Sequence, residues 1–240
     1  MTVRLFIVAG QSNAIGYGMS PATLPAHLAT MAWGQTYVKP LDSPWWGVLD
    51  PGVNTGANGM WGGWVETAYQ LRVAYPNDVL LFVLSAQGST GVAVDGGAAD
   101  WSPQSAGELF DLTTARVESA RATLSGILGD LGPATVLWRG GETDAYDAWK
   151  AASHFDFLPA LIDASRAAWG ADHWIIARLN APMTPYVKAV RAAEMVSELD
   201  DPLVSGFATD GFALQADNLH DAAAAHVAIG QGFFHAYMEL

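Results

Sequence analysis

The stretch Val3-Arg4-Leu5-Phe6-Ile7-Val8-Ala9, followed directly by Gly10-Gln11-Ser12-Asn13, decides the fold. Its near-continuous hydrophobicity is typical of a strand buried inside a parallel sheet. Similar apolar runs recur at residues 79–85, 134–138, 174–179 and 203–209. Helix-like stretches alternate with them at residues 64–75, 114–131, 148–169, 186–199 and 222–238. This rhythm predicts an α/β fold, a three-layer α/β/α sandwich around a parallel sheet of about five strands.

Length and composition indicate one domain that spans residues 1–240. The chain is 51% hydrophobic and 15% charged, which suits a large buried core and excludes a disordered chain. No apolar run approaches the ~20 residues that a membrane span needs. The apolar N-terminal stretch is short and leads straight into a candidate site, so we interpret it as mature structure and not as a cleavable signal peptide. A cytoplasmic or virion-associated protein is therefore favoured.

Charge and residue types exclude several classes of function. The formal net charge of −13 repels phosphate backbones and argues against a nucleic-acid partner. The chain has no cysteine, so disulfides, thiolate catalysis and zinc–thiolate sites are excluded. His220 and His226 lack the spacing of a zinc-protease motif. We therefore expect no metal, no other cofactor and no membrane partner, while the oligomeric state stays open.

Ser12 lies in a small polar turn directly after the first predicted strand. Ligands bind at this end of the strands in open α/β sheets. A serine placed there can expose its hydroxyl and direct its own N–H at a developing oxyanion. The spacing differs from that of Gly-x-Ser-x-Gly, and on turn chemistry alone a structural turn serine is the commoner explanation.

A second candidate is Asp217-Asn218-Leu219-His220, near the C-terminal end of the sequence. This short loop would present a carboxylate and an imidazole together, as a catalytic triad requires. The alternative is an aspartate that caps the following helix, beside a surface histidine.

Two further polar segments also follow predicted strands. One is Ala86-Gln87-Gly88-Ser89-Thr90-Gly91, and the other is Trp138-Arg139-Gly140-Gly141-Glu142-Thr143-Asp144. Neither segment has the Gly-Lys-Ser/Thr ending of a phosphate-binding P-loop. Since the carboxyl ends of parallel strands share one edge of the sheet, all four polar segments are predicted to converge there.

Together the four segments resemble the motifs of SGNH hydrolases. Gly10-Gln11-Ser12-Asn13 is similar to the first motif of the branch that holds sialate O-acetylesterases and acetylxylan esterases. Gln87-Gly88-Ser89 resembles that branch's Gly-Gly-Ser/Thr motif, residues 138–144 resemble Trp-x-Gln-Gly-Glu-Ser-Asp, and residues 217–220 match Asp-x-x-His. The resemblance implies a flavodoxin-like sheet and an esterase that removes acetyl groups from carbohydrates.

The resemblance also assigns roles to the matching residues. Ser12 would be the nucleophile, His220 the general base and Asp217 the residue that orients His220. The N–H groups of Ser12 and Gly88 would bind the oxyanion. The family's third donor is a glutamine side chain, which Gly140 replaces here, so the amides of Gln11, Asn13 and Gln87 are candidates for that task. Glu142 and Asp144 would brace the Ser12 loop, although Asp144 also fits a solvated helix start.

Two other functions compete with a carbohydrate O-acetylesterase. Gly140 favours a glycan-binding protein, virion- or wall-associated, with a weakened esterase site. A general SGNH lipase or thioesterase would instead need an apolar acyl channel. Several tryptophans in or directly beside the irregular segments 20–63 and 88–107 fit either a sugar-binding cleft or a satellite core under the loops; they are Trp45, Trp46, Trp61, Trp64 and Trp101.

Overall fold

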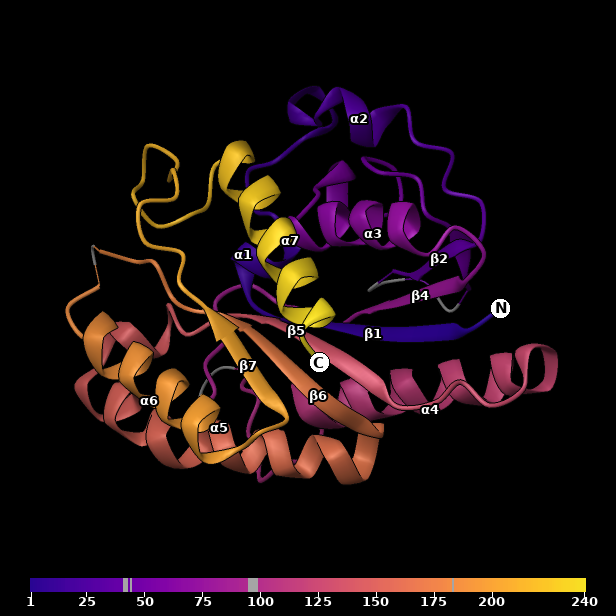
Figure 1. Cartoon of the computed structure of the whole chain (residues 1–240). Coiled ribbons are helices and arrows are strands. Elements are labelled where there is room, and N and C mark those ends of the chain that lie inside the picture. The colour runs from indigo at the N-terminus through magenta and orange to yellow at the C-terminus, as the bar shows by residue number, and fades with distance from the viewer. Residues whose placement is uncertain (41–42, 44, 95–98, 183) are drawn as a thin grey trace.

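A computed structural model describes residues 1–40, 43, 45–94, 99–182 and 184–240. Within these residues the chain forms a three-layer α/β/α sandwich, as the sequence predicts (Figure 1). The central sheet has the strand order β3-β2-β4-β1-β5-β6-β7, and all neighbouring strands are parallel except β2 and β3. Its strands are β1 Val3–Gly10, β2 Thr36–Lys39, β3 Gly47–Val48, β4 Val79–Leu84, β5 Ala134–Arg139, β6 Ala171–Ala177 and β7 Val204–Phe207.

The sheet of the described residues has seven strands, so the expected number of about five was too low. The two additional strands, β2 and β3, lie in the segment that shows no clear periodicity. They are four and two residues long, too short to produce a pattern. β6 also begins earlier than predicted, at Ala171, because Asp172 and His173 interrupt the apolar run.

The helices cover both faces of the sheet (Figure 1). α3 and α7 lie on one face, and α4 and α5 lie on the other, with α6 beside α5. The alternation of side chains along β1 explains this division. Leu5 and Ile7 pack toward α4 and α5, whereas Phe6 and Val8 pack toward α3 and α7. The helices are α1 Ser12–Ile15, α2 Ala26–Ala29, α3 Gly63–Ala74, α4 Leu109–Leu128, α5 Ala148–Trp169, α6 Val187–Asp200 and α7 Ala223–Met238, with short 3-10 turns η1 Pro21–Thr23, η2 Ala57–Gly59 and η3 Asp144–Tyr146.

Close contact between α3 and α7 depends on Gly230. A Cβ atom at this position would lie 2.3 Å from the carbonyl oxygen of Gly63 and 2.4 Å from the Cβ of Glu66. Glycine ordinarily weakens a helix, but here it allows two helix backbones to approach each other. This contact fixes α7 against the sheet, directly after the loop that carries His220. Among the described residues, no helix is long and apolar enough to cross a membrane.

Candidate active site

Two glycines shape the turn that presents Ser12. Gly10 ends β1 with φ +120°, and a Cβ there would lie 2.0 Å from the carbonyl oxygen of Arg139 on the neighbouring strand. Gly16 ends α1 in the left-handed conformation, and a Cβ there would collide with the backbone of Trp61. The turn is therefore packed tightly on both sides, and Ser12 becomes the first residue of the short helix α1.

Ser12, His220 and Asp217 form a continuous chain of hydrogen bonds. The Ser12 hydroxyl lies 3.1 Å from Nε2 of His220, and Nδ1 of His220 lies 2.6 Å from Oδ2 of Asp217. Because a carboxylate only accepts hydrogen bonds, Nδ1 carries the proton and Nε2 is left to accept from Ser12. The structure thus brings together the three residues that the sequence analysis singled out, over a separation of 208 positions.

The second carboxylate oxygen of Asp217 stabilises the loop that carries His220. Oδ1 accepts hydrogen bonds of 3.0 Å from the N–H groups of Leu219 and His220. Partial burial opposes ionisation of Asp217, but the hydrogen bonds from His220 and Leu219 outweigh it and lower the pKa of Asp217 to about 2. The side chain is therefore a carboxylate throughout the neutral range. Asn218, between these residues, has φ +54°, a sparsely populated conformation for a residue other than glycine.

Asn13 ties the nucleophile turn to two other segments. Its Nδ2 donates to Oε1 of Glu142 at 2.6 Å and to the carbonyl oxygen of Leu219 at 3.1 Å. Its Oδ1 accepts from the N–H of Asp221 at 2.8 Å. Both amide hydrogens of this buried side chain are therefore engaged, which leaves none to donate to a substrate.

A buried ion cluster lies behind these contacts. Arg139 makes a bidentate pair with Asp221, at 3.0 and 3.1 Å, and its Nη1 lies 3.7 Å from Oε1 of Glu142. Burial disfavours the guanidinium charge, but Asp221 and Glu142 outweigh that effect and hold the pKa of Arg139 above its usual range. Arg139 lies in one of the candidate segments but was assigned no role from the sequence, and Asp221 was not predicted. An arginine at the end of an otherwise apolar strand was the available signal.

Asp144 braces a different loop. Its Oδ2 accepts from the N–H of Val92 at 2.8 Å and lies 3.2 Å from Nδ1 of His154. Asp144 is fully buried, so a solvated helix start is not its environment. It connects the segment after β5 to the segment after β4, whereas Glu142 contacts the Ser12 turn through Asn13.

The four residues proposed around the oxyanion lie in different surroundings. Gly88 is adjacent to Ser12, since a Cβ at Gly88 would lie 3.7 Å from the Ser12 Cβ. Gln11 is buried, lines the pocket beside Ser12 and accepts a hydrogen bond from the Thr143 N–H at 3.4 Å. Gln87 is exposed and is not part of that pocket lining. Gly140 is not part of the pocket lining, and a Cβ there would be 3.2 Å from the Trp138 ring.

The pocket at Ser12 has a volume of about 580 Å³ and is lined mostly by residues with polar side chains. Loops that follow β1, β4 and β5 contribute to it, together with the His220 loop. The sequence analysis missed several of these residues, above all Tyr17 and Tyr146. The lining consists of Gln11, Ser12, Tyr17, Gly88, Ser89, Glu142, Thr143, Tyr146, Asp147, Lys150, Leu219 and His220.

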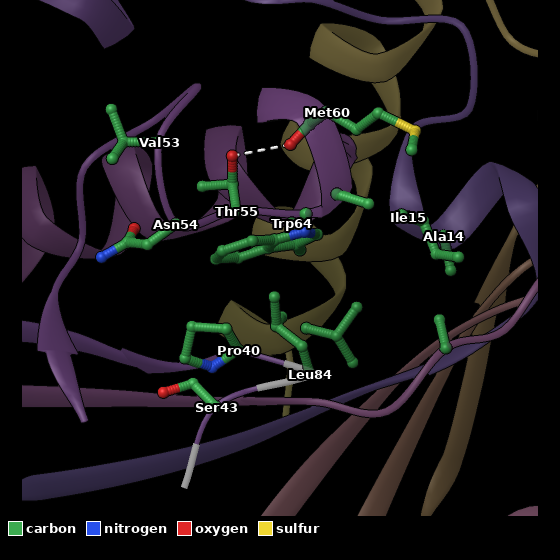
Figure 2. Close-up of a pocket in the computed structure, with 14 residues that line it drawn as sticks. Ala14, Ile15, Pro40, Ser43, Val53, Asn54, Thr55, Met60, Trp64 and Leu84 are labelled. Carbon is green, nitrogen blue, oxygen red and sulfur yellow. Dashed lines mark hydrogen bonds between the residues drawn. The ribbon is translucent and has the colours of Figure 1, made fainter. Parts of the chain in front are cut away.

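A second, mostly apolar pocket of about 440 Å³ lies on the other side of α1 (Figure 2). Figure 2 shows the Trp64 ring between Thr55 and Met60 on one side and Pro40 and Leu84 on the other. Ala14 and Ile15 of α1 also line this pocket, but neither Ser12 nor His220 does. The apolar space therefore does not adjoin the Ser12–His220 pair.

The tryptophans of the irregular segments belong mainly to the core. Trp61, Trp64 and Trp101 are fully buried, and the Trp101 indole donates to the Thr90 hydroxyl at 3.2 Å. Trp45 is exposed, yet neither it nor Trp46 lines the Ser12 pocket. The three buried rings belong to the two main cores on either face of the sheet and not to a satellite core, and the aromatic residues of the pocket are tyrosines instead.

Comparisons with known proteins identify the family of the chain. The family model of the carbohydrate esterases described as sialic acid-specific acetylesterases matches residues 2–239. A search of curated proteins finds no match to the chain.

Several solved structures share the fold. A protein from Arabidopsis thaliana is 23% identical, with 100% of this chain and 99% of that chain covered and a TM-score of 0.79. NanS is 15% identical, with coverage of 100% and 98% and a TM-score of 0.71. A carbohydrate acetylesterase from Xanthomonas citri is 15% identical, with coverage of 99% of this chain but 57% of that chain, and a TM-score of 0.65. These structures confirm the predicted fold, and the family model confirms the resemblance of the sequence to sialate O-acetylesterases.

Proposed function

The chain belongs to the carbohydrate esterase family of sialic acid-specific acetylesterases and is a carboxylic ester hydrolase, and we propose that it releases acetate from carbohydrates through an acyl-enzyme on Ser12. The observation that supports this mechanism best is the hydrogen-bond chain from Ser12 through His220 to Asp217. This is the arrangement of nucleophile, base and orienting carboxylate that acyl transfer needs.

In the proposed first step, Oγ of Ser12 attacks the acetyl carbonyl while its proton passes to Nε2 of His220. The tetrahedral intermediate collapses, and His220 returns the proton to the sugar oxygen that leaves. Water then attacks the acetyl-Ser12 ester with His220 again as base, which releases acetate and restores the serine. Asp217, ionised at neutral pH, stabilises the imidazolium that forms in each step.

The oxyanion would be bound by the backbone N–H groups of Ser12 and Gly88. As the first residue of α1, Ser12 has an N–H without a partner inside the helix. For the third donor we propose the side chain of Gln11, because it is the one of the three candidate amides that lines the pocket. The Asn13 amide is engaged elsewhere, and Gln87 lies outside the lining.

A short acyl group fits this site better than a long one. The pocket that contains Ser12 has Leu219 as its one aliphatic side chain, and the more apolar pocket is lined by neither Ser12 nor His220. A lipase or thioesterase would need apolar surface that continues from the reacting carbonyl. Acetate should therefore be released much faster than octanoate from otherwise identical esters.

The proposed substrates are neutral or short acetylated saccharides, because a protein with a net charge of −13 repels polyanionic glycans. Acetate release would be measured from acetylated xylo-oligosaccharides, an O-acetylated sialoside and O-acetylated peptidoglycan. The neutral xylo-oligosaccharides should react fastest. Faster release from the sialoside would overturn the charge argument while leaving the esterase proposal intact.

Ser12→Ala tests the catalytic proposal directly. The variant should lose acetate release to background, while its thermal unfolding stays close to that of the wild type, because a hydroxyl at a turn contributes little stability. Background activity already in the wild-type protein, together with saccharide binding, would favour a glycan-binding protein. Undiminished hydrolysis in Ser12→Ala would rule out Ser12 as the nucleophile.

A further inference from the structure

We propose that Tyr17 and Tyr146 form an aromatic platform that binds the sugar ring of the substrate and selects saccharide esters over simple alkyl esters. The inference rests on the proposed function and adds the residues that recognise the alcohol part of the ester. Both tyrosines line the pocket that contains Ser12, and both residues are 53% exposed. About half of the surface of each residue is therefore open to water, in the pocket that also contains the proposed nucleophile.

Tyr17 is fixed next to the reacting groups. It follows Gly16 at the end of α1, and its N–H donates to the Ser12 carbonyl at 2.9 Å. Its carbonyl accepts a 2.7 Å hydrogen bond from the Gln215 side chain. The ring lies 4.4 Å from the His220 ring, centroid to centroid. A sugar whose ester carbonyl reaches Ser12 would therefore contact Tyr17.

Tyr146 enters the pocket from the segment after β5. It ends the turn η3, and its N–H donates to the Thr143 carbonyl at 3.3 Å. Thr143 lines the same pocket and donates its own N–H to Gln11. The backbone that carries Tyr146 is thus connected to the proposed oxyanion site, which holds this backbone at a defined position relative to the Ser12 turn.

The chemistry of the wall suits a pyranose ring. One face of a sugar consists of C–H groups that pack on an aromatic ring, while its edges carry hydroxyls that need donors and acceptors. Asp147 and Lys150 line the pocket beside Tyr146 and offer a carboxylate and an ammonium group. A simple alkyl acetate has no such ring and would gain nothing from the tyrosines.

The test compares two acetate esters in the wild type and in Tyr146→Ala. One is an acetylated xylotriose and the other is ethyl acetate, since p-nitrophenyl acetate carries an aromatic ring that would itself stack on tyrosine. The ratio of kcat/KM for xylotriose to that for ethyl acetate should fall by about tenfold in Tyr146→Ala, mainly through KM. Tyr146→Phe keeps the ring and should retain most of the ratio.

Tyr186→Ala is the matched control. Tyr186 is also an exposed tyrosine, at 40%, but it does not line the Ser12 pocket, so its removal should leave the ratio unchanged. An unchanged ratio in Tyr146→Ala would overturn the platform while leaving the esterase proposal intact. So would an equal loss in Tyr146→Phe, which would assign the effect to the hydroxyl.

Binding measurements separate the platform from catalysis. Calorimetry of acetylated xylotriose with Ser12→Ala, and with Ser12→Ala combined with Tyr146→Ala, requires no turnover. The second protein should bind about tenfold more weakly. Equal affinity of the two proteins, or no measurable binding to Ser12→Ala, would overturn the platform whatever the fate of the proposed hydrolysis.

Discussion

Asn13 and Glu142 are 129 residues apart in the sequence, yet Nδ2 of Asn13 donates to Oε1 of Glu142 at 2.6 Å inside the protein. The bond joins the turn after β1 to the segment after β5. Glu142 also lies 3.7 Å from the Arg139 guanidinium, so its charge is balanced where water does not reach it. The geometry of Ser12 therefore depends on a carboxylate that takes no part in the proton transfers of the proposed reaction.

Removal of this carboxylate should weaken the fold and the activity together. We expect Glu142→Ala to lower the free energy of unfolding by about 1–3 kcal/mol, because it leaves the buried Nδ2 of Asn13 without its short hydrogen bond. Urea unfolding measures the loss. Asp163→Ala removes an exposed ion pair with Arg166 and should change stability by less than about 0.5 kcal/mol. Equal stability of Glu142→Ala and wild type would show that the buried cluster does not hold the turn.

Gln11 and Gly140 allow a rescue experiment on the oxyanion site. If Gln11 supplies the third donor, Gln11→Ala should lower kcat by about 10²-fold. Gly140 has φ outside the left-handed region, so a glutamine is conformationally allowed there. Adding Gly140→Gln to Gln11→Ala should then restore part of kcat.

Gly140→Ala in the same background is the control for that rescue. It introduces the same Cβ, 3.2 Å from the Trp138 ring, without an amide. If kcat recovers with Gly140→Gln but not with Gly140→Ala, the glutamine amide is the hydrogen-bond donor responsible for the recovery. Wild-type kcat in Gln11→Ala would instead mean that the oxyanion site is complete without Gln11.

His226 should make stability fall in mild acid. Burial, with the nearby charges of Arg139 and His220, outweighs Asp221 and lowers the pKa of His226 to about 4. An unfolded histidine titrates near ~6.5, so between these values the unfolded chain binds more protons than the folded one. Stability is thus lost as the pH falls from about 6.5 to 4, by up to about 3 kcal/mol.

His226→Phe keeps an aromatic ring beside Trp61 and removes the titrating group. The difference in unfolding free energy between wild type and variant, measured by urea titration at several pH values, should vary across this window. A difference that stays constant from pH 7 to 4 would contradict the assignment.

Glu194, in contrast to His226, should make the folded protein less stable as the pH rises toward neutral. Burial and the Glu142 charge outweigh His154, Arg139 and the Leu179 N–H, and they raise the pKa of Glu194 to about 7. An unfolded glutamate ionises near ~4.3, so the folded protein binds more protons between these values and loses stability as the pH rises. Glu194→Gln should therefore be more stable than wild type above pH 7, by up to about 3 kcal/mol, and the gain should disappear near pH 4. Unfolding curves at both pH values check this.

Much of the fold could be predicted from periodicity. The bounds of α5, residues 148–169, agree with the prediction, because a long stretch of helical pattern begins at a capping aspartate and ends at a glycine. The short strands β2 and β3 could not be predicted from the sequence. Their pairing with neighbouring strands holds them in the sheet, and their own residue pattern does not indicate a strand.

The candidate site could be predicted where its motif residues follow strands, as Ser12 does. The pairing of Arg139 with Asp221 could not, because the two residues are 82 positions apart and meet only in the folded chain. The same limit applies to the amides around Ser12. Their residue types were known from the sequence, but which of them faces the pocket depends on the contacts that Asn13 and Gln11 make after folding.

The 208-residue separation of Ser12 and His220 has a consequence for biosynthesis. A ribosome completes the Ser12 turn early, but the proposed base appears only when most of the chain has been translated, and α7 must then dock on α3 to hold the His220 loop in place. A nascent or truncated polypeptide that ends before this segment would carry an unactivated serine. Acetate release during cell-free translation should therefore begin only after full-length chains accumulate.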